Sequence, residues 1–220
     1  MYFKTIILKF ESNQEIKGKS DQLRGFFASE FKEYPLSHQH IDNKLIYSYP
    51  LIQYKIINKV PMIIGINEGI EVLKKIFSEY DYLNIGVKKY KIYQKEIILK
   101  KQDFKLTDIL FNYTFQSPWL ALNKQNYEKY LKLGTWEKRK ELLEKILIGN
   151  ILSISKSLGY TVSDKIKANI GYFKEEHVTL KGTPMLAFSG KFSINFEIPD
   201  YWGIGKSVSR GFGTIKKIIN

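Results

Sequence analysis

The amino-acid sequence predicts an α+β protein made of two consecutive units with the same succession of strands and helices. The chain has 220 residues, which is enough for two small domains. Segments rich in β-branched and aromatic residues alternate with amphipathic segments up to residue 101. A second series of the same kind begins near residue 105, so we expect two domains, at 1–104 and 105–220.

The first unit begins with a strand at 2–11, because YFKTIILKFE is β-branched and aromatic without helical spacing. A helix follows, in which apolar residues recur at helical spacing at Leu23, Phe26, Phe27 and Phe31. A strand at 44–57 comes next, in which Pro50 indicates an edge strand or a bulge. A strand at 61–66, a helix at 67–80 and a strand at 88–101 complete the unit. The order is β-α-β-β-α-β, which is that of a ferredoxin-like (RRM-like) domain with one open sheet face.

The second unit repeats this pattern without a visible sequence repeat. A strand within 108–122 precedes a helical region at 123–159. One face of that region is apolar, through Leu142, Leu143, Ile146, Leu147, Ile151 and Ile154. Strands return at 165–173, 177–198 and 213–219. We therefore expect two tandem ferredoxin-like domains, with a glycine-rich loop near the C-terminus.

The composition indicates a polyanionic partner. The formal net charge is +13 and the sequence pI is about 9.5, and 15% of the residues are aromatic. Cationic and stacking side chains together suit RNA or single strands, whereas a merely soluble basic protein, or one that coats DNA or an anionic membrane, is the alternative. Cysteine is absent, which excludes disulfides, thiol catalysis and cysteine-based zinc sites. With no signal peptide or membrane-length apolar run, we expect a cytoplasmic protein.

The segment YWGIGKSVSRGFGTIKKI at 201–218 is the most distinctive stretch of the chain. It is not a phosphate-binding P-loop, because Asp200 stands where the first glycine should be and a strand-like segment follows. A dinucleotide fingerprint also fails, since Val208 occupies the third glycine position. The segment can be a hairpin turn, or its glycines can let the backbone approach a ligand while Lys206, Ser207, Ser209 and Arg210 meet phosphates.

The spacing G-x-G-x(5)-G-F-G resembles the C-terminal glycine-rich loop of the RAMP superfamily. In particular it is similar to that of the CRISPR-associated endoribonucleases that cut precursor CRISPR RNA at its repeats. The match is carried by Gly203, Gly205, Arg210, Gly211, Phe212 and Gly213. Residues 26–73 are similar to one branch of these enzymes, in which a loop with a His-x-His pair precedes a strand of the type Y-x-Y-P-L-[IV]-Q-Y-K. The resemblance implies cleavage of repeat RNA without a metal or other cofactor.

The histidines are the candidate catalytic groups. Self-cleavage of RNA needs a base for the 2′-hydroxyl and an acid for the departing 5′-oxygen, and imidazole suits both tasks. The chain has three histidines, of which His38 and His40 would point to the same side of an extended segment. We assign His40 as the essential group, acting as general base, and His38 as acid or helper, although the roles can be exchanged. A metal site with Asp42 or an ordinary polar loop is the alternative for this pair.

Other residues complete the predicted site. The hydroxyl of Tyr47 can hydrogen-bond the scissile phosphate, and Lys32 can offset its negative charge. His177 is expected to be an ordinary surface histidine. We expect RNA contacts from a set of cationic, small and hydroxyl-bearing residues: Lys17, Lys19, Arg24, Lys32, Gly203, Gly205, Lys206, Ser207, Ser209, Arg210, Gly211 and Gly213.

The expected partner is CRISPR repeat RNA, with other subunits of a CRISPR effector as further candidates. No membrane partner is expected, and a monomer and a homodimer are both compatible with the sequence. The alternative function is that of a non-catalytic RNA-binding RAMP subunit, which would share the fold and the glycine-rich loop but not the reaction.

Overall fold

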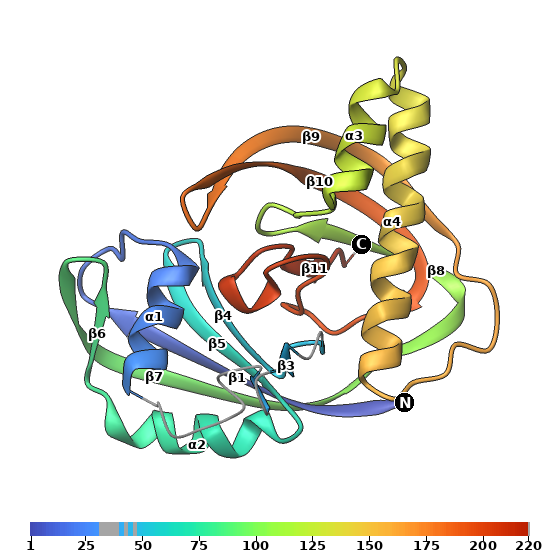
Figure 1. Cartoon of the computed structure of the whole chain (residues 1–220). Coiled ribbons are helices and arrows are strands. Elements are labelled where there is room, and N and C mark those ends of the chain that lie inside the picture. The colour runs from blue at the N-terminus through green and yellow to red at the C-terminus, as the bar shows by residue number, and fades with distance from the viewer. Residues whose placement is uncertain (31–39, 42–43, 46–47, 220) are drawn as a thin grey trace. The chain divides into compact units, whose positions relative to one another are not determined.

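The computed structural model describes residues 1–30, 40–41, 44–45 and 48–219 (Figure 1). The chain forms two compact units. The N-terminal unit comprises residues 2–102 together with 209–211, and the C-terminal unit comprises residue 1, residues 103–208 and the segment from 212 onward. No helix among the described residues is long and apolar enough to span a membrane.

The N-terminal unit contains a five-stranded sheet with the order β4-β5-β1-β7-β6. Its strands are β1 (Tyr2–Ser12), β4 (Ile52–Ile57), β5 (Val60–Ile66), β6 (Tyr82–Ile85) and β7 (Lys88–Asp103), and its helices are α1 (Ser20–Glu30) and α2 (Gly69–Glu79). The strand β6 was not predicted. The remaining order, β4-β5-β1-β7, is that of a ferredoxin-like sheet. A separate pair of short strands, β2 (His40–Ile41) and β3 (Lys44–Leu45), lies between α1 and β4.

Alternation along the strands builds the core of this unit. Ile6, Leu8 and Phe10 on β1 are buried in one cluster with Leu23 and Phe27 of α1. The same cluster includes residues of α2, so both helices cover one face of the sheet (Figure 1). The strand predicted at 44–57 is interrupted: β3 holds its start and β4 holds its end, with Pro50 between them. Proline has no N–H for a ladder hydrogen bond, which explains the break.

The C-terminal unit contains a four-stranded sheet with the order β11-β8-β10-β9. Its elements are β8 (Lys105–Phe115), α3 (Lys124–Lys132), α4 (Trp136–Ser157), β9 (Ala168–Leu180), β10 (Thr183–Glu197), the 3₁₀ helix η2 (Val208–Arg210) and β11 (Ile215–Lys217). The strand order is again ferredoxin-like. Between β10 and β11, where the pattern calls for a second helix, the chain instead follows the glycine-rich segment with its single turn η2. The predicted α+β class with ferredoxin-like folds is confirmed.

Two caps and one apolar stripe define the helices of the C-terminal unit. The side chain of Asn123 accepts a hydrogen bond from the backbone N–H of Asn126 at 2.7 Å and starts α3, and Thr135 does the same for Lys138 at 3.4 Å at the start of α4. The stripe of α4 that the sequence predicts is buried, through Leu142, Leu143, Leu147, Ile151 and Ile154, while Ile146 is half-buried. This stripe packs α4 against β9.

Candidate nucleic-acid interface

The predicted catalytic residues lie mostly outside the described part of the chain. His38, Tyr47 and Lys32 belong to segments that the structure does not describe. The backbone of His40 lies in β2, where it pairs with Leu45 of β3 in antiparallel register. Asp42, the third residue of the alternative metal site, also falls outside the described residues. The catalytic assignment of the histidine pair therefore stays a prediction.

The glycine-rich segment is held by backbone hydrogen bonds within the C-terminal unit. Ile204 N–H donates to Gly213 O at 2.9 Å, which closes the base of the loop. Lys206 N–H donates to Leu120 O at 3.1 Å, and Gly213 N–H donates to Pro118 O at 2.8 Å. The loop is thus an ordered structure, and the hairpin interpretation holds for its base, where Gly203 also pairs with Thr214.

Close packing explains why Gly213 is glycine. Its φ is +63°, in the left-handed region, and an added Cβ would overlap with the carbonyl oxygen of Ile204. Gly203, Gly211 and Gly213 are all buried. These glycines shape the loop, and the polar side chains of the loop that reach solvent include the exposed Lys206 and the half-buried Ser209 and Arg210.

Residues 209–211 pack within the N-terminal unit against the start of α1. An added Cβ on Gly211, whose φ is +87°, would overlap with Ser20 and lie 3.0 Å from the carbonyl oxygen of Tyr54. Ser20 itself is engaged, because its Oγ accepts a hydrogen bond from Ile56 N–H at 2.9 Å. The loop backbone therefore lies directly against the first turn of α1 and against β4.

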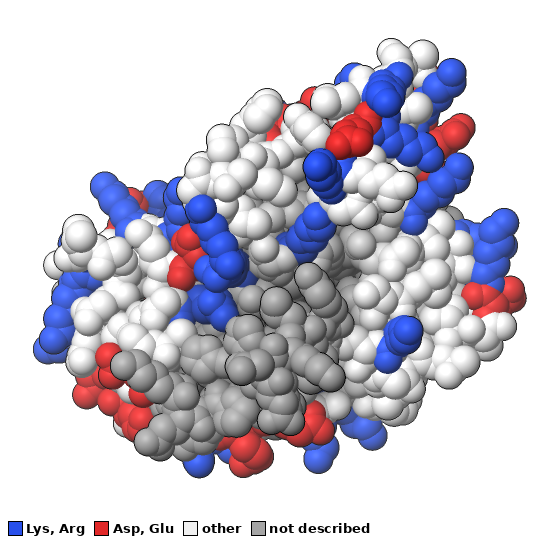
Figure 2. All heavy atoms as spheres, in the orientation of Figure 1, with Lys and Arg blue, Asp and Glu red and all other residues white. Residues whose placement is uncertain are grey.

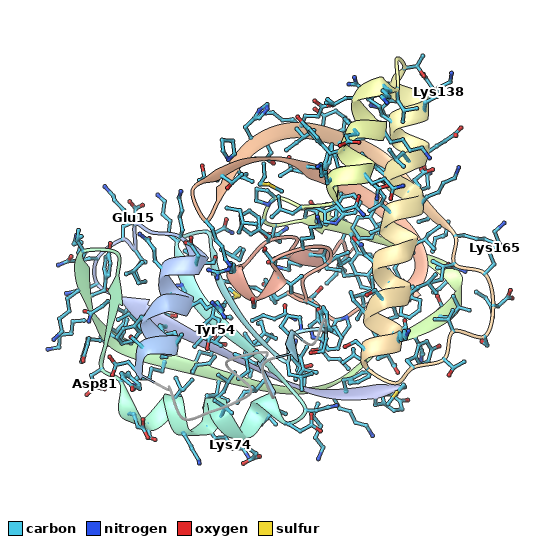
Figure 3. All side chains as sticks on the ribbon, in the orientation of Figure 1. Glu15, Tyr54, Lys74, Asp81, Lys138 and Lys165 are labelled. Atoms are coloured by element: carbon cyan, nitrogen blue, oxygen red, sulfur yellow. The ribbon has the colours of Figure 1, made fainter. Side chains whose placement is uncertain are left out.

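This packing brings the guanidinium groups of Arg24 and Arg210 close to each other. Burial and the positive charge of Arg210 both lower the pKa of Arg24. Burial raises the pKa of Tyr54, which is labelled in Figure 3, to about 12. The positive charge of Arg24 opposes this effect. Among the ion pairs formed by the described residues, none includes either guanidinium. Two half-buried like charges are unfavourable together, and a bound anion would offset their repulsion.

Lysines surround the same end of α1. Lys17 and Lys19 are exposed and immediately precede the helix. Their backbones are fixed, since Lys17 N–H donates to the Tyr90 hydroxyl at 3.0 Å and Lys19 N–H donates to Gln22 Oε1 at 2.9 Å. The predicted RNA-binding residues of the N-terminal unit that the structure describes thus gather around one helix end together with Arg210.

Lys206 has a different place, in the C-terminal unit. Its Nζ donates to Leu122 O at 2.9 Å, and burial lowers the pKa of the ammonium group. The neighbouring Ser207 has a φ of +56° and is half-buried. The structure therefore does not group Lys206 with Arg24 and Arg210 in one unit, although all three were predicted to contact RNA.

The surface charge of the α3–α4 hairpin is mixed. Figure 2 shows basic and acidic side chains side by side at the end of this hairpin. Interspersed charges of both signs are typical of a solvated surface. Those predicted RNA-binding residues that the structure describes lie outside this hairpin, at the start of α1 and in the glycine-rich segment.

One unusual residue of the N-terminal unit was not predicted. Lys55 in β4 is wholly buried, and burial lowers the pKa of its ammonium group to about 7. Its neighbours along the strand, Gln53 and Tyr54, are buried as well. A lysine within a strand gives no local sign of burial, so the sequence held no signal for it beyond its place in the Y-x-Y-P-L-I-Q-Y-K stretch.

Comparison with known proteins identifies the family. The chain matches the model of the Cas6b N-terminal domain over residues 1–103 and that of the Cas6b C-terminal domain over residues 105–218. An uncharacterised protein of Methanocaldococcus jannaschii is 43% identical over 136 residues, which are 62% of this chain and 92% of the relative.

Two solved structures extend the similarity to nearly the whole chain. A crystal structure of Cas6b superposes with a TM-score of 0.93 at 40% identity, over 99% of this chain and all of the other. A structure described as the CRISPR RNA processing endoribonuclease Cas6b gives a TM-score of 0.79 at 37% identity over 99% of this chain and 100% of the other. This chain therefore belongs to the Cas6b family, which confirms its resemblance to the CRISPR-associated RNA-processing proteins.

Proposed function

We propose that this protein is an endoribonuclease that cuts precursor CRISPR RNA within its repeats. The similarity over the whole chain to a Cas6b described as a CRISPR RNA processing endoribonuclease carries this proposal. The high positive charge and the two guanidinium groups at the start of α1, which form no ion pair with another described residue, support an RNA substrate. In this proposal residues 1–104 form the domain with the catalytic histidine loop, and residues 105–220 form the domain with the glycine-rich loop.

The proposed reaction is an internal transfer at one phosphate. The 2′-oxygen attacks the adjacent phosphorus while His40 removes its proton, and the bond from phosphorus to the 5′-oxygen breaks. His38 gives a proton to that oxygen, and the two histidines can exchange roles. Tyr47 and Lys32 hold the phosphate and offset its charge. One product ends in a 2′,3′-cyclic phosphate and the other begins with a 5′-hydroxyl. The proposed reaction requires no metal or cofactor.

Binding of the RNA backbone is assigned first to the end of α1. Arg24 and Arg210 lie close together without an acidic partner among the described residues, and Lys17 and Lys19 are exposed beside them. We infer that one phosphate lies between the two guanidinium groups, because its charge would offset their mutual repulsion. The lysines and Ser209 would hold neighbouring phosphates.

A cleavage assay with excess EDTA tests the reaction. Labelled transcripts of the repeat from the same genome should be cut at one position, and mass spectrometry of the fragments should show a cyclic phosphate and a 5′-hydroxyl. Cutting that occurs only when a divalent metal is added would overturn the mechanism. Tight binding of RNA whose length never changes would instead favour the non-catalytic RAMP subunit.

The His40→Ala variant tests the assigned base. Removing a general acid–base group slows cutting by roughly 100- to 10,000-fold and leaves RNA binding nearly unchanged. Single-turnover rates measure the first effect and fluorescence anisotropy measures the second. Added imidazole should restore part of the rate in this variant. A variant that cuts as fast as the wild type would remove His40 from the mechanism.

A further inference from the structure

An open cavity of about 470 Å³ lies within the C-terminal unit, between α3 and the end of the β9–β10 hairpin. Tyr127 and Leu131 of α3 form one side of it, and Leu186 of β10 lies on the other. His177 of β9, which the proposed reaction does not use, and Lys206 of the glycine-rich segment also line it. Pockets for small organic ligands have volumes of about 300–1,000 Å³, so this cavity has room for one nucleotide.

The strand register explains why the cavity exists. His177 pairs with Leu186, and two residues further along the hairpin Glu175 pairs with Phe188. Residues two apart share a face of a strand, so all four lie on the same side of the sheet. Phe188 is covered by Tyr130 of α3, with ring centroids 5.3 Å apart. Toward the hairpin turn this packing stops, and His177 is left exposed.

The helical side of the cavity is apolar and partly uncovered. Tyr127 is 43% exposed and Leu131 is 56% exposed. They are four residues apart on α3 and therefore on one helix face. When large apolar side chains are exposed next to a cavity, a ligand that covers them removes apolar surface from water, which favours binding. A flat aromatic group can stack on the ring of Tyr127 and contact the leucines on both sides.

The charge of the cavity is positive. Lys206 and Lys124 line it, and the Nζ of Lys206 is held at 2.9 Å from Leu122 O. Glu175, the acidic residue in the lining, accepts hydrogen bonds from the Tyr130 hydroxyl at 2.6 Å and from Arg139 Nη1 at 3.2 Å. Its charge is thus already balanced by Arg139. The cavity therefore suits a ligand that combines a flat apolar ring with a negative group.

We propose that this cavity binds one unpaired nucleotide of the RNA, with its base stacked on Tyr127 and its phosphate beside Lys206. The inference rests on the proposed function, because Lys206 belongs to the glycine-rich segment that we assign to RNA binding. The base lies between Tyr127 and Leu186, and the imidazole of His177 at the edge can hydrogen-bond to it. The site thus gives His177 a role in binding and none in cleavage.

Replacement of Tyr127 tests the site. The probe is the repeat RNA with a 2′-deoxyribose at the mapped cut position, or the unmodified repeat if it is not cut. Base–aromatic stacking is worth about 1–3 kcal/mol, so Tyr127→Ala should weaken binding roughly 5- to 150-fold while Tyr127→Phe should bind like the wild type. Tyr172→Ala is the matched control, because this exposed tyrosine lies on the opposite face of β9. Anisotropy titrations measure all four proteins.

Two further measurements locate the bound nucleotide. RNA with 5-iodouridine in place of uridine should cross-link to Tyr127 or His177 on irradiation, and peptide mass spectrometry should identify the site. A single abasic position in the repeat should weaken binding to the wild type as much as Tyr127→Ala does. The same abasic RNA should bind the Tyr127→Ala variant with no additional loss.

The outcomes separate this inference from the proposed function. If the protein cuts the repeat, but Tyr127→Ala binds like Tyr172→Ala and no cross-link falls in α3 or in the β9–β10 hairpin, the nucleotide site is wrong and the cleavage proposal stands. If the repeat is not cut, but binding depends on Tyr127, the site stands and cleavage is wrong. Absence of any RNA binding would overturn both.

Discussion

The buried side chain of Lys55 makes the stability of the protein depend on pH. The pKa of this ammonium group falls from 10.5 to about 7 in the folded chain because burial penalises the charged form. Between these two values the unfolded chain binds more protons than the folded chain does. The free energy of unfolding must therefore rise as the pH rises above 7, and it is lowest below the folded pKa.

The Lys55→Met variant should remove this dependence. We expect the wild-type free energy of unfolding to increase by an amount on the order of 3 kcal/mol between pH values of about 7 and 9.5, and the variant to show a much flatter profile. Urea denaturation across this range is the measurement, with Lys91→Met at an exposed position of β7 as the control. Higher pH is avoided, because the raised pKa of Tyr54, about 12, lowers stability above the usual tyrosine pKa. Identical slopes for Lys55→Met and wild type would show that Lys55 does not titrate in this window.

The guanidinium groups of Arg24 and Arg210 should oppose stability and support RNA binding. Burial, and after it the charge of Arg210, lowers the pKa of Arg24. Replacing either arginine by methionine removes the repulsion between the two charges, so neither variant should be less stable than the wild type. Each variant should bind repeat RNA roughly 10- to 150-fold more weakly, since a hydrogen bond to a charged group is worth about 1.5–3 kcal/mol. If both arginines contact the same phosphate, the loss of RNA affinity in the double variant should be smaller than the product of the two single fold-losses. Unchanged affinity in both single variants would place the RNA elsewhere.

At the scale of elements, the glycine-rich segment stands where the ferredoxin-like pattern has its second helix. Its residues 209–211 pack on α1 and β4, and this contact depends on the missing side chain of Gly211. The packing places Arg210 next to Arg24. Residues 209–211 thus make a close backbone contact that also positions a cation.

Gly211→Ala should separate the cost of this packing from the cost of the backbone conformation. Gly182, in the turn between β9 and β10, is the matched control, because its φ is +81° against +87° for Gly211 and an added Cβ there meets no atom within 4 Å. Gly182→Ala should cost about 1–2 kcal/mol from the left-handed conformation alone. Gly211→Ala should cost clearly more, because the methyl group overlaps with Ser20. If thermal denaturation shows the same loss of stability in both variants, the packing of Gly211 against α1 accommodates a methyl group without an energetic penalty.

At the scale of the whole molecule, the net charge of +13 predicts RNA binding that weakens with salt. Three phosphates, one neutralised by Arg24 with Arg210 and one each by Lys17 and Lys19, give a slope of log K against log salt of about −2 for a single strand, or roughly 20-fold weaker binding when the salt concentration rises fourfold. Lys19→Met should make this slope less steep by about 0.7. Anisotropy titrations at several salt concentrations test both statements. A slope near zero would mean that the cations do not contact the backbone.

The organisation of the chain followed from local patterns. Residues 2–12, the first helix and the apolar stripe of α4 were predictable because alternation and helical spacing are properties of neighbouring residues. The strand β6 and the interruption at Pro50 were not predicted, since edge strands and breaks depend on what pairs beside them. Arg24 and Arg210 were each predicted to bind RNA, but their closeness was not, because 185 residues lie between them in the chain.

By itself the sequence determined the fold class, the family resemblance and the large positive charge, and it supplied the candidate groups for action on RNA. These depend on residue type and on spacing along the chain. Only the tertiary structure decided that Lys55 is buried, that Gly211 lies against Ser20 and brings two guanidinium groups together, and that Tyr127, His177 and Lys206 share a cavity. Burial and side-chain proximity arise from contacts between distant segments, and no local pattern encodes which segments will meet.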